Sequence, residues 1–166
     1  MKADLHVHSI FSHDAITKPE SILSAAADRG IGIIALTDHD TALGWNAIKA
    51  LEPNYPVQVI LGQEIKVYRN QQRIGELLGL FLQKPLQSKT IPLVIEEIHS
   101  QNGLVSIPHP FCERRGEFRG YEDINDLQGI AVEARNGRTY KERDNEMAAG
   151  FADRLQSMQT AGSDAH

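Results

Sequence analysis

The chain has 166 residues, of which 41% are hydrophobic and 23% are charged, as is ordinary for one globular domain spanning residues 1–166. Its formal net charge of −5 argues against a nucleic-acid-binding surface, which usually presents a basic face. No stretch approaches the roughly 20 apolar residues needed to cross a bilayer, and the amino terminus lacks the apolar core of a signal peptide. The lone cysteine, Cys112, cannot form an internal disulfide, so we expect a cytoplasmic protein.

Short apolar runs alternate with helical patterns along the chain. The first run covers residues 2–8, and the helical pattern after it opens at Pro19, with Thr17 as its N-cap and Gly30 as its stop. Later runs, interpreted as strands, cover residues 32–37, 57–67, 76–82, 104–108, 129–134 and 160–164. Further helical patterns cover residues 91–102 and about 142–159.

This alternation favours parallel strands joined by right-handed crossovers. The third and fourth strands are the exception, because only the polar loop 68–75 joins them and it suits a hairpin turn. Seven strands in this order predict an α/β fold, a distorted seven-stranded β/α barrel, with an open doubly wound sheet as the alternative. In a β/α barrel, functional groups gather at the carboxyl ends of the strands.

Histidines and carboxylates cluster at those predicted strand ends. His6 and His8 are two residues apart on the first strand, so their side chains point to the same face. Asp164 and His166 repeat this spacing after the last strand, and Asp14 stands in a loop that can fold back over the site. Imidazoles and carboxylates are the ligands that Zn²⁺, Mn²⁺ and Fe²⁺ prefer. The pattern therefore predicts a polynuclear metal-dependent hydrolase.

Three further ligand candidates follow the inner strands. His39 comes after a continuous apolar run, where a charged cluster is costly unless it is paired or bound to metal. Glu64 is the best bridging group, because a carboxylate can join two cations. His109 lies between two prolines that stiffen its loop. We expect Asp38 to orient a ligand imidazole and Asp40 to cap the next helix.

Taken together, these motifs resemble the PHP family, named for polymerase and histidinol phosphatase, over essentially the whole chain. The resemblance is carried by His6-Val7-His8, Ser12-His13-Asp14, Thr37-Asp38-His39-Asp40, Gly62-Gln63-Glu64, Pro108-His109-Pro110 and Gly162-Ser163-Asp164-Ala165-His166. It implies a distorted seven-stranded barrel that holds two or three divalent metal ions (Zn, Mn or Fe) at its carboxyl face. Members usually continue through a further loop and helix, so we expect either a polypeptide longer than this one or a barrel that lacks its C-terminal helix.

The resemblance also implies which residues hold each ion. The first would be bound by His6, His8, Glu64 and Asp164, the second by Glu64 and His109, and the third by Asp14, His39 and His166. The family usually adds a histidine to the second position where the fourth strand opens. This chain has Glu76 there, which still coordinates but adds negative charge and is a harder ligand. Asn136 stands where the resemblance implies a polar site residue.

These features predict a phosphoesterase that hydrolyses a phosphomonoester or phosphodiester by a hydroxide formed between metal ions. A small phosphate ester, a nucleotide or an oligonucleotide end would serve as substrate. Arginine suits bidentate contact with phosphate, and the candidates are Arg114, Arg115, Arg135 and Arg138. The alternatives are an amidohydrolase-like metallohydrolase that cleaves C–N or C–O bonds, and a non-catalytic metal-binding PHP module. The sequence leaves the exact substrate and the oligomeric state open.

Overall fold

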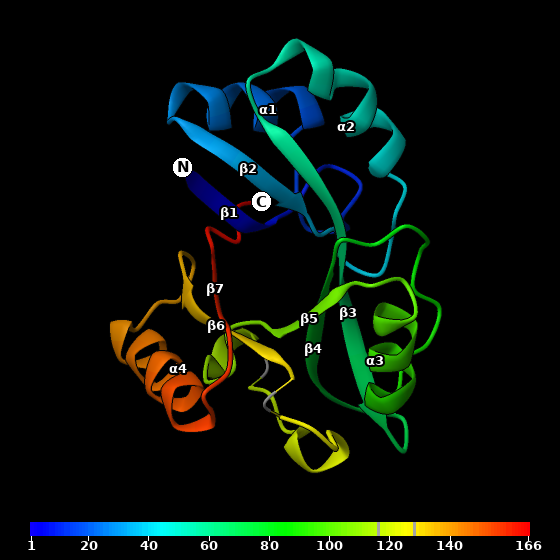
Figure 1. Cartoon of the computed structure of the whole chain (residues 1–166), viewed down its shortest axis with the longest axis vertical. Helices are drawn as coiled ribbons and strands as arrows, with labels where there is room; N and C mark the ends of the chain where they lie inside the picture. The colour runs from blue at the N-terminus through cyan, green and yellow to red at the C-terminus, as the bar shows by residue number, and fades with distance from the viewer. Residues whose placement is uncertain (116, 128) are drawn as a thin grey trace.

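The computed structural model describes residues 1–115, 117–127 and 129–166 (Figure 1). Within these ranges a single sheet takes its strands in chain order, which confirms the predicted α/β arrangement of seven strands. The pairs β3–β4 and β4–β5 are antiparallel, and the other neighbouring pairs are parallel. The strands are β1 (Lys2–Val7), β2 (Ile31–Leu36), β3 (Gln58–Arg69), β4 (Gln72–Leu80), β5 (Leu104–Ile107), β6 (Ala131–Asn136) and β7 (Gln159–Gly162).

The first and last strands meet, which nearly closes the sheet into a barrel. Val7 forms a parallel bridge with Ala165, and His8 N donates to the Ala165 carbonyl at 2.9 Å. Asp164 N donates to the His6 carbonyl at 2.8 Å. Figure 1 accordingly shows the C-terminus beside β1. The sheet is therefore a distorted barrel, and the open doubly wound alternative was wrong.

A tight hairpin joins β3 to β4, as the polar loop predicted. Its two turn residues, Asn70 and Gln71, have φ values of 49° and 65°. Two consecutive residues with positive φ are typical of a type I′ turn, whose twist matches that of antiparallel strands. Both strands run further toward the turn than predicted, because polar Gln72 and Arg73 still pair with β3.

Four helices of the described ranges cover the outside of the barrel: α1 (Pro19–Asp28), α2 (Trp45–Leu51), α3 (Ile91–His99) and α4 (Glu142–Leu155). Gly30 has φ 65° and ends α1 as predicted. The N-cap prediction was wrong, because Lys18 occupies that position without a side-chain cap and Thr17 donates to the His166 carbonyl at 3.1 Å instead. No helix in the described part of the chain is long and apolar enough to cross a bilayer.

Apolar side chains pack on both faces of the sheet. The larger cluster lies between the strands and the helices α1, α2 and α3, where Ile34, Leu36 and Ile65 are almost fully buried. A smaller cluster of Ala35, Ile60 and Leu80 uses the alternate positions and fills the barrel interior. The rest of the barrel interior is polar, and the metal-ligand candidates lie there.

Candidate metal centre

Four buried side chains aim one donor atom each at the same small volume. The Nε2 atoms of His6 and His8 are 3.0 Å apart, and each lies 3.3 Å from Glu64 Oε2. Asp164 Oδ1 lies 3.6 Å from the first of these nitrogens and 3.5 Å from the second. Zn²⁺ bonded at ordinary lengths to four tetrahedral N and O ligands would hold them roughly 3.3–3.6 Å apart. The side chains predicted for the first position are therefore brought together at the spacing that a cation needs.

The carboxylate of Asp164 shows why a cation fits here. Its Oδ1 atom is fully buried and has no hydrogen-bond partner among the described residues. Its Oδ2 atom, in contrast, accepts from Asn136 Nδ2 at 3.1 Å and lies 3.0 Å from Arg115 Nη1. A buried carboxylate oxygen without a partner is costly, and a bound metal ion would satisfy it.

The backbone adopts an uncommon conformation at two of the predicted ligands. Asp164 has φ 55° and His109 has φ 29°, in a region that residues other than glycine seldom adopt. Both stand just past the end of a strand, β7 and β5 respectively. Unfavourable dihedrals persist where the surrounding fold imposes them, and they gather at functional sites. Here they mark two predicted ligands.

Glu64 links the first position to a second one. Its Oε2 atom faces the first ligand set, whereas its Oε1 atom lies 3.1 Å from His109 Nε2. Glu76 Oε2 lies 3.8 Å from the same ring nitrogen, and Glu76 Oε1 lies 3.7 Å from His39 Nδ1. The two oxygens of Glu64 thus point at different donor groups, which is the arrangement a bridging ligand requires.

A third group forms at the mouth of the barrel. Asp14 Oδ2 lies 3.5 Å from His39 Nε2 and 3.2 Å from His166 Nε2. The rings of His8 and His166 are adjacent, with centroids 4.1 Å apart. The Asp14 side chain is 40% exposed, so this position is open to solvent while the first is closed. All three predicted ligand sets are therefore spatial neighbours around His8 and Glu64.

The charges of the site depend on one another. Burial raises the pKa of Glu64, but the charge of His6 and hydrogen bonds from three histidines outweigh it and hold that pKa well below its usual range. Burial lowers the pKa of His6, but Glu133 and Glu64 raise it well above the ordinary value. Burial, and then the charge of Glu64, raise the pKa of Glu76 to about 7. A cation that binds here must therefore displace protons from His6 and Glu76, whereas Glu64 is already ionised.

Glu133, on β6, is a site residue that the sequence prediction missed. Its Oε1 atom lies 2.9 Å from His6 Nδ1, on the far side of the ring from the donor cluster. Its Oε2 atom accepts from the backbone N–H of His109 at 2.8 Å and from Asn136 Nδ2 at 3.0 Å. A carboxylate behind a ligating imidazole fixes its orientation and tautomer. The signal in the sequence was a carboxylate near the end of the apolar run 129–134.

We expect Glu133→Gln to weaken metal binding by about 10–100-fold, as is usual when a partner behind a ligand is lost. Glu133 accepts hydrogen bonds from three groups, but an amide has only one oxygen to accept with. Metal titration followed by calorimetry would measure the loss. Glu146→Gln, on the exposed face of α4, is the matched control. Equal affinities for the two variants would refute the orienting role.

Asp38 has a different partner from the one predicted. Its carboxylate accepts from Ser9 N at 2.6 Å and from Ser9 Oγ at 2.7 Å, so among the described hydrogen bonds it holds a loop rather than an imidazole. Ser12 makes the ring contact instead: its Oγ lies 3.2 Å from His8 Nδ1 and accepts from His39 N at 2.8 Å.

Asp40 does not cap α2, whose N-cap is Gly44. Asp40 instead has φ 55°, and its carboxylate accepts from Lys66 N at 3.2 Å and pairs with Lys89. The aspartate therefore ties the segment after β2 to β3 and to the loop before α3, rather than starting a helix.

The four arginine candidates divide into two pairs. Arg115 lies 3.0 Å and Arg138 lies 3.8 Å from the Asp164 carboxylate, so both border the first ligand set. Arg135 pairs with Glu142 on the outer surface, where its side chain is 69% exposed. Arg114 stacks on the ring of exposed Tyr140, 4.7 Å from its centroid. The structure therefore places Arg135 and Arg114 away from the donor cluster.

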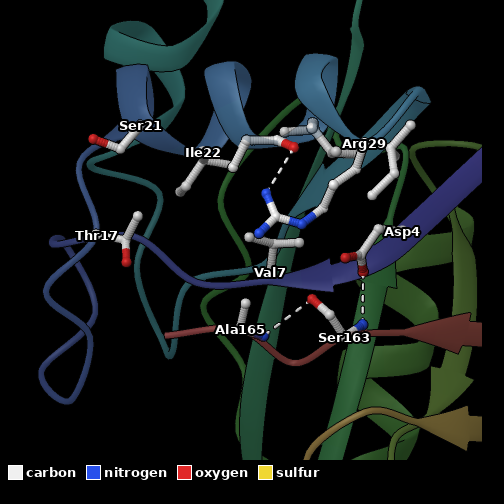
Figure 2. Close-up of a pocket in the computed structure, with 12 residues that line it drawn as sticks. Asp4, Val7, Thr17, Ser21, Ile22, Arg29, Ser163 and Ala165 are labelled. Carbon is white, nitrogen blue, oxygen red and sulfur yellow. Dashed lines mark hydrogen bonds between the residues drawn. The ribbon is translucent and has the colours of Figure 1, made fainter.

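A separate pocket of about 330 Å³ lies between α1 and β1 (Figure 2). Its floor includes Val7, whose side chain points away from the face that carries His6 and His8. The two charged side chains that line the pocket already have partners. Asp4 accepts a hydrogen bond from Ser163 N at 2.8 Å, and Arg29 donates one to the Ala25 carbonyl at 3.0 Å. The pocket lies behind the donor cluster and shares none of the predicted metal ligands.

Comparison with known proteins identifies relatives of the chain. An uncharacterised protein of Methanocaldococcus jannaschii is 36% identical over 146 residues, which cover 80% of this chain and 81% of that protein. A phosphoribosyl 1,2-cyclic phosphate 1,2-diphosphodiesterase of Eggerthella lenta is 41% identical over 81 residues, which cover 48% of this chain and 30% of that enzyme.

The fold also matches solved structures. One is a two-domain protein of Bacteroides vulgatus described as containing a PHP-like metal-dependent phosphoesterase, with a TM-score of 0.83 at 20% identity. That match covers 100% of this chain, which spans 52% of the length of that protein. The family model of the PHP domain matches residues 4–154. Because that model covers most of the sequence, the chain belongs to the PHP domain family.

Proposed function

We propose that this protein is a metal-dependent phosphoesterase that hydrolyses a phosphomonoester or phosphodiester. The observation that carries the proposal is the convergence of His6, His8, Glu64 and Asp164 on one small volume, where a buried oxygen of Asp164 has no hydrogen bond from any described residue. Membership of the PHP domain family and the phosphodiesterase named among the relatives support it. A small phosphate ester, a nucleotide or an oligonucleotide end is the proposed substrate.

His6, His8, Glu64 and Asp164 would hold the first ion, Glu64, Glu76 and His109 the second, and Asp14, His39 and His166 the third. Bound divalent ions supply Lewis acidity and lower the pKa of coordinated water toward neutrality. Glu133 and Ser12 keep two of the imidazoles in place. The buried position of the first set excludes bulk water from it, which strengthens the electrostatic interactions within.

Arg115 and Arg138 are the proposed phosphate contacts. Their side chains are 19% and 42% exposed, so both can reach a ligand while they border Asp164. Phosphoryl transfer needs positioning and charge neutralisation more than covalent help from the protein. Guanidinium groups provide both, because their fork of donors matches two phosphate oxygens.

The proposal is tested with the purified protein, reloaded with Mn²⁺ or Zn²⁺ after chelation and assayed on p-nitrophenyl phosphate, its bis ester and a panel of nucleotides and short oligonucleotides. We expect hydrolysis that depends on added metal and is abolished by the double substitution His6→Ala, His8→Ala. Full activity in that double variant would refute the proposal. Turnover of amide or lactone substrates alone would favour a metallohydrolase of the amidohydrolase kind, and bound metal without any turnover would favour a non-catalytic module.

Arg115→Ala should raise KM for a phosphate ester and lower kcat/KM by about tenfold or more, since a charge-assisted hydrogen bond contributes roughly 1.5–3 kcal/mol. Steady-state kinetics on the metal-loaded protein would measure this. Arg143→Ala, on the exposed face of α4, is the control and should leave both constants unchanged. An unchanged kcat/KM for Arg115→Ala would remove this arginine from the proposed site.

A further inference from the structure

The second metal position is richer in oxygen than the first. Glu64 Oε1 and Glu76 Oε2 face His109 Nε2 there, so the proposed set has two carboxylates and one imidazole. His39 Nδ1 lies 3.7 Å from Glu76 Oε1, but His39 is assigned to the third ion through its Nε2 atom, which faces Asp14. The first position has two imidazoles beside its two carboxylates. Carboxylate oxygens suit hard cations such as Mn²⁺, whereas imidazole nitrogens suit Zn²⁺. The two positions therefore differ in the ion that their donors favour.

Glu76 is held for this role by its neighbours. Its side chain is almost fully buried, and a buried carboxylate needs a paired charge or a bound metal. Arg73 Nη2 lies 2.8 Å from Glu76 Oε1, which leaves Oε2 on the side of His109. The same Nη2 atom also donates to the carbonyl of Arg115 at 3.0 Å, so two partners hold this end of the guanidinium.

The neighbouring strand adds a second positive charge. Lys66 is paired across the hairpin with Glu76, and both residues stand on the same face of the sheet as Glu64. Lys66 and Arg73 together offset the negative charge that a second carboxylate brings to this position. The glutamate is therefore built into the hairpin with its own counter-charges.

We propose that Glu76 makes the second position selective for a hard divalent cation such as Mn²⁺ over Zn²⁺, and that Arg73 positions its carboxylate for that purpose. The inference rests on the proposed metal centre. It concerns which ion binds and not which reaction follows, so it is read out by metal content rather than by turnover.

The test strips the purified protein with a chelator, reloads it in equimolar Mn²⁺ and Zn²⁺, and counts the ions per chain by elemental analysis after gel filtration. Electron paramagnetic resonance of free Mn²⁺ gives its affinity. We expect Mn²⁺ beside Zn²⁺ in the wild type, and Zn²⁺ in place of Mn²⁺ in Glu76→His, with Mn²⁺ affinity at least about tenfold lower. Arg73→Gln should weaken Mn²⁺ binding by about 10–100-fold.

Two further variants separate selectivity from damage to the fold. Glu76→Gln keeps the side-chain shape and should lose Mn²⁺ without gaining Zn²⁺, while the control Glu146→His should keep the wild-type ratio. The same ratio of Mn²⁺ to Zn²⁺ in the wild type and Glu76→His would overturn the inference and leave the phosphoesterase proposal standing. If the wild type retained Mn²⁺ but hydrolysed no phosphoester, the selectivity inference would stand and the phosphoesterase proposal would be overturned. If no metal were retained in the wild type or in any variant, both would be overturned.

Discussion

Glu64→Gln should remove metal from two positions at once and reduce phosphoester hydrolysis by more than about a hundredfold. That reduction exceeds the roughly 10–100-fold effect that is usual when the hydrogen-bond partner of a metal ligand is removed. The reason is geometric, because the two oxygens of Glu64 face different donor groups: Oε2 lies 3.3 Å from His6 Nε2, and Oε1 lies 3.1 Å from His109 Nε2. An amide offers one oxygen and no charge. Elemental analysis together with steady-state kinetics would measure both effects.

Two comparisons keep this result interpretable. Glu64→Asp retains the charge but shortens the reach, so it should keep more metal than Glu64→Gln. Glu146→Gln changes the same chemistry on an exposed helix face and should behave as the wild type. If Glu64→Gln kept its full complement of ions in a folded protein, the bridging role would have to be abandoned.

Gly162→Ala should lower the free energy of unfolding by about 1–3 kcal/mol and weaken metal binding together with it. A Cβ atom at this position would stand 2.3 Å from His6 Cβ and 2.8 Å from His6 N. Neither atom can move without shifting β1, so β7 would be pushed away from the strand that carries two ligands. Thermal unfolding should show a melting temperature lower by roughly 2–12 °C.

Gly150→Ala is the natural control, because Gly150 lies within α4 and its new Cβ would have only Arg154 Nη1 nearby, at 3.6 Å. Alanine is a better helix former there by roughly 0.5–1 kcal/mol, so this variant should melt slightly higher and bind metal normally. If Gly162→Ala left the melting temperature and the metal content unchanged, close contact between β1 and β7 at this position would not be needed for stability or for metal binding.

The strand order was predictable because each apolar run ends at a polar cluster, and the pattern therefore located both the strand and its functional end. A helix was expected after Asp40, but the bounds of α2 were not predicted, because seven residues are too few to display a helical period clearly. The predicted barrel implied that β1 and β7 meet, but the register of their contact lay beyond the sequence pattern. Its hydrogen bonds join Asp164 to His6 and His8 to Ala165, and spacing along the chain carries no information about such distant partners.

The ligand candidates were predictable from chemistry, since imidazoles and carboxylates at strand ends have few structural uses. The groups behind them were not. Glu133 follows a short apolar run and is close to the charged Arg135 on the same strand, so nothing local distinguishes it from a surface residue. Arg114 and Arg115 are adjacent in sequence, and only the short turn at Glu113–Arg115 decides that the second reaches Asp164. The assignment of ions to particular ligands stays a prediction.

The first ligand set joins residues near opposite ends of the polypeptide, since Asp164 N is hydrogen bonded to the His6 carbonyl. Such a pairing has very high contact order, and long-range contacts of this kind form late because loop closure must precede them. A nascent chain emerging from the ribosome would hold His6 and His8 long before Asp164 exists. Metal binding at the proposed first position would therefore require that the long-range pairing of β1 with β7 has already formed.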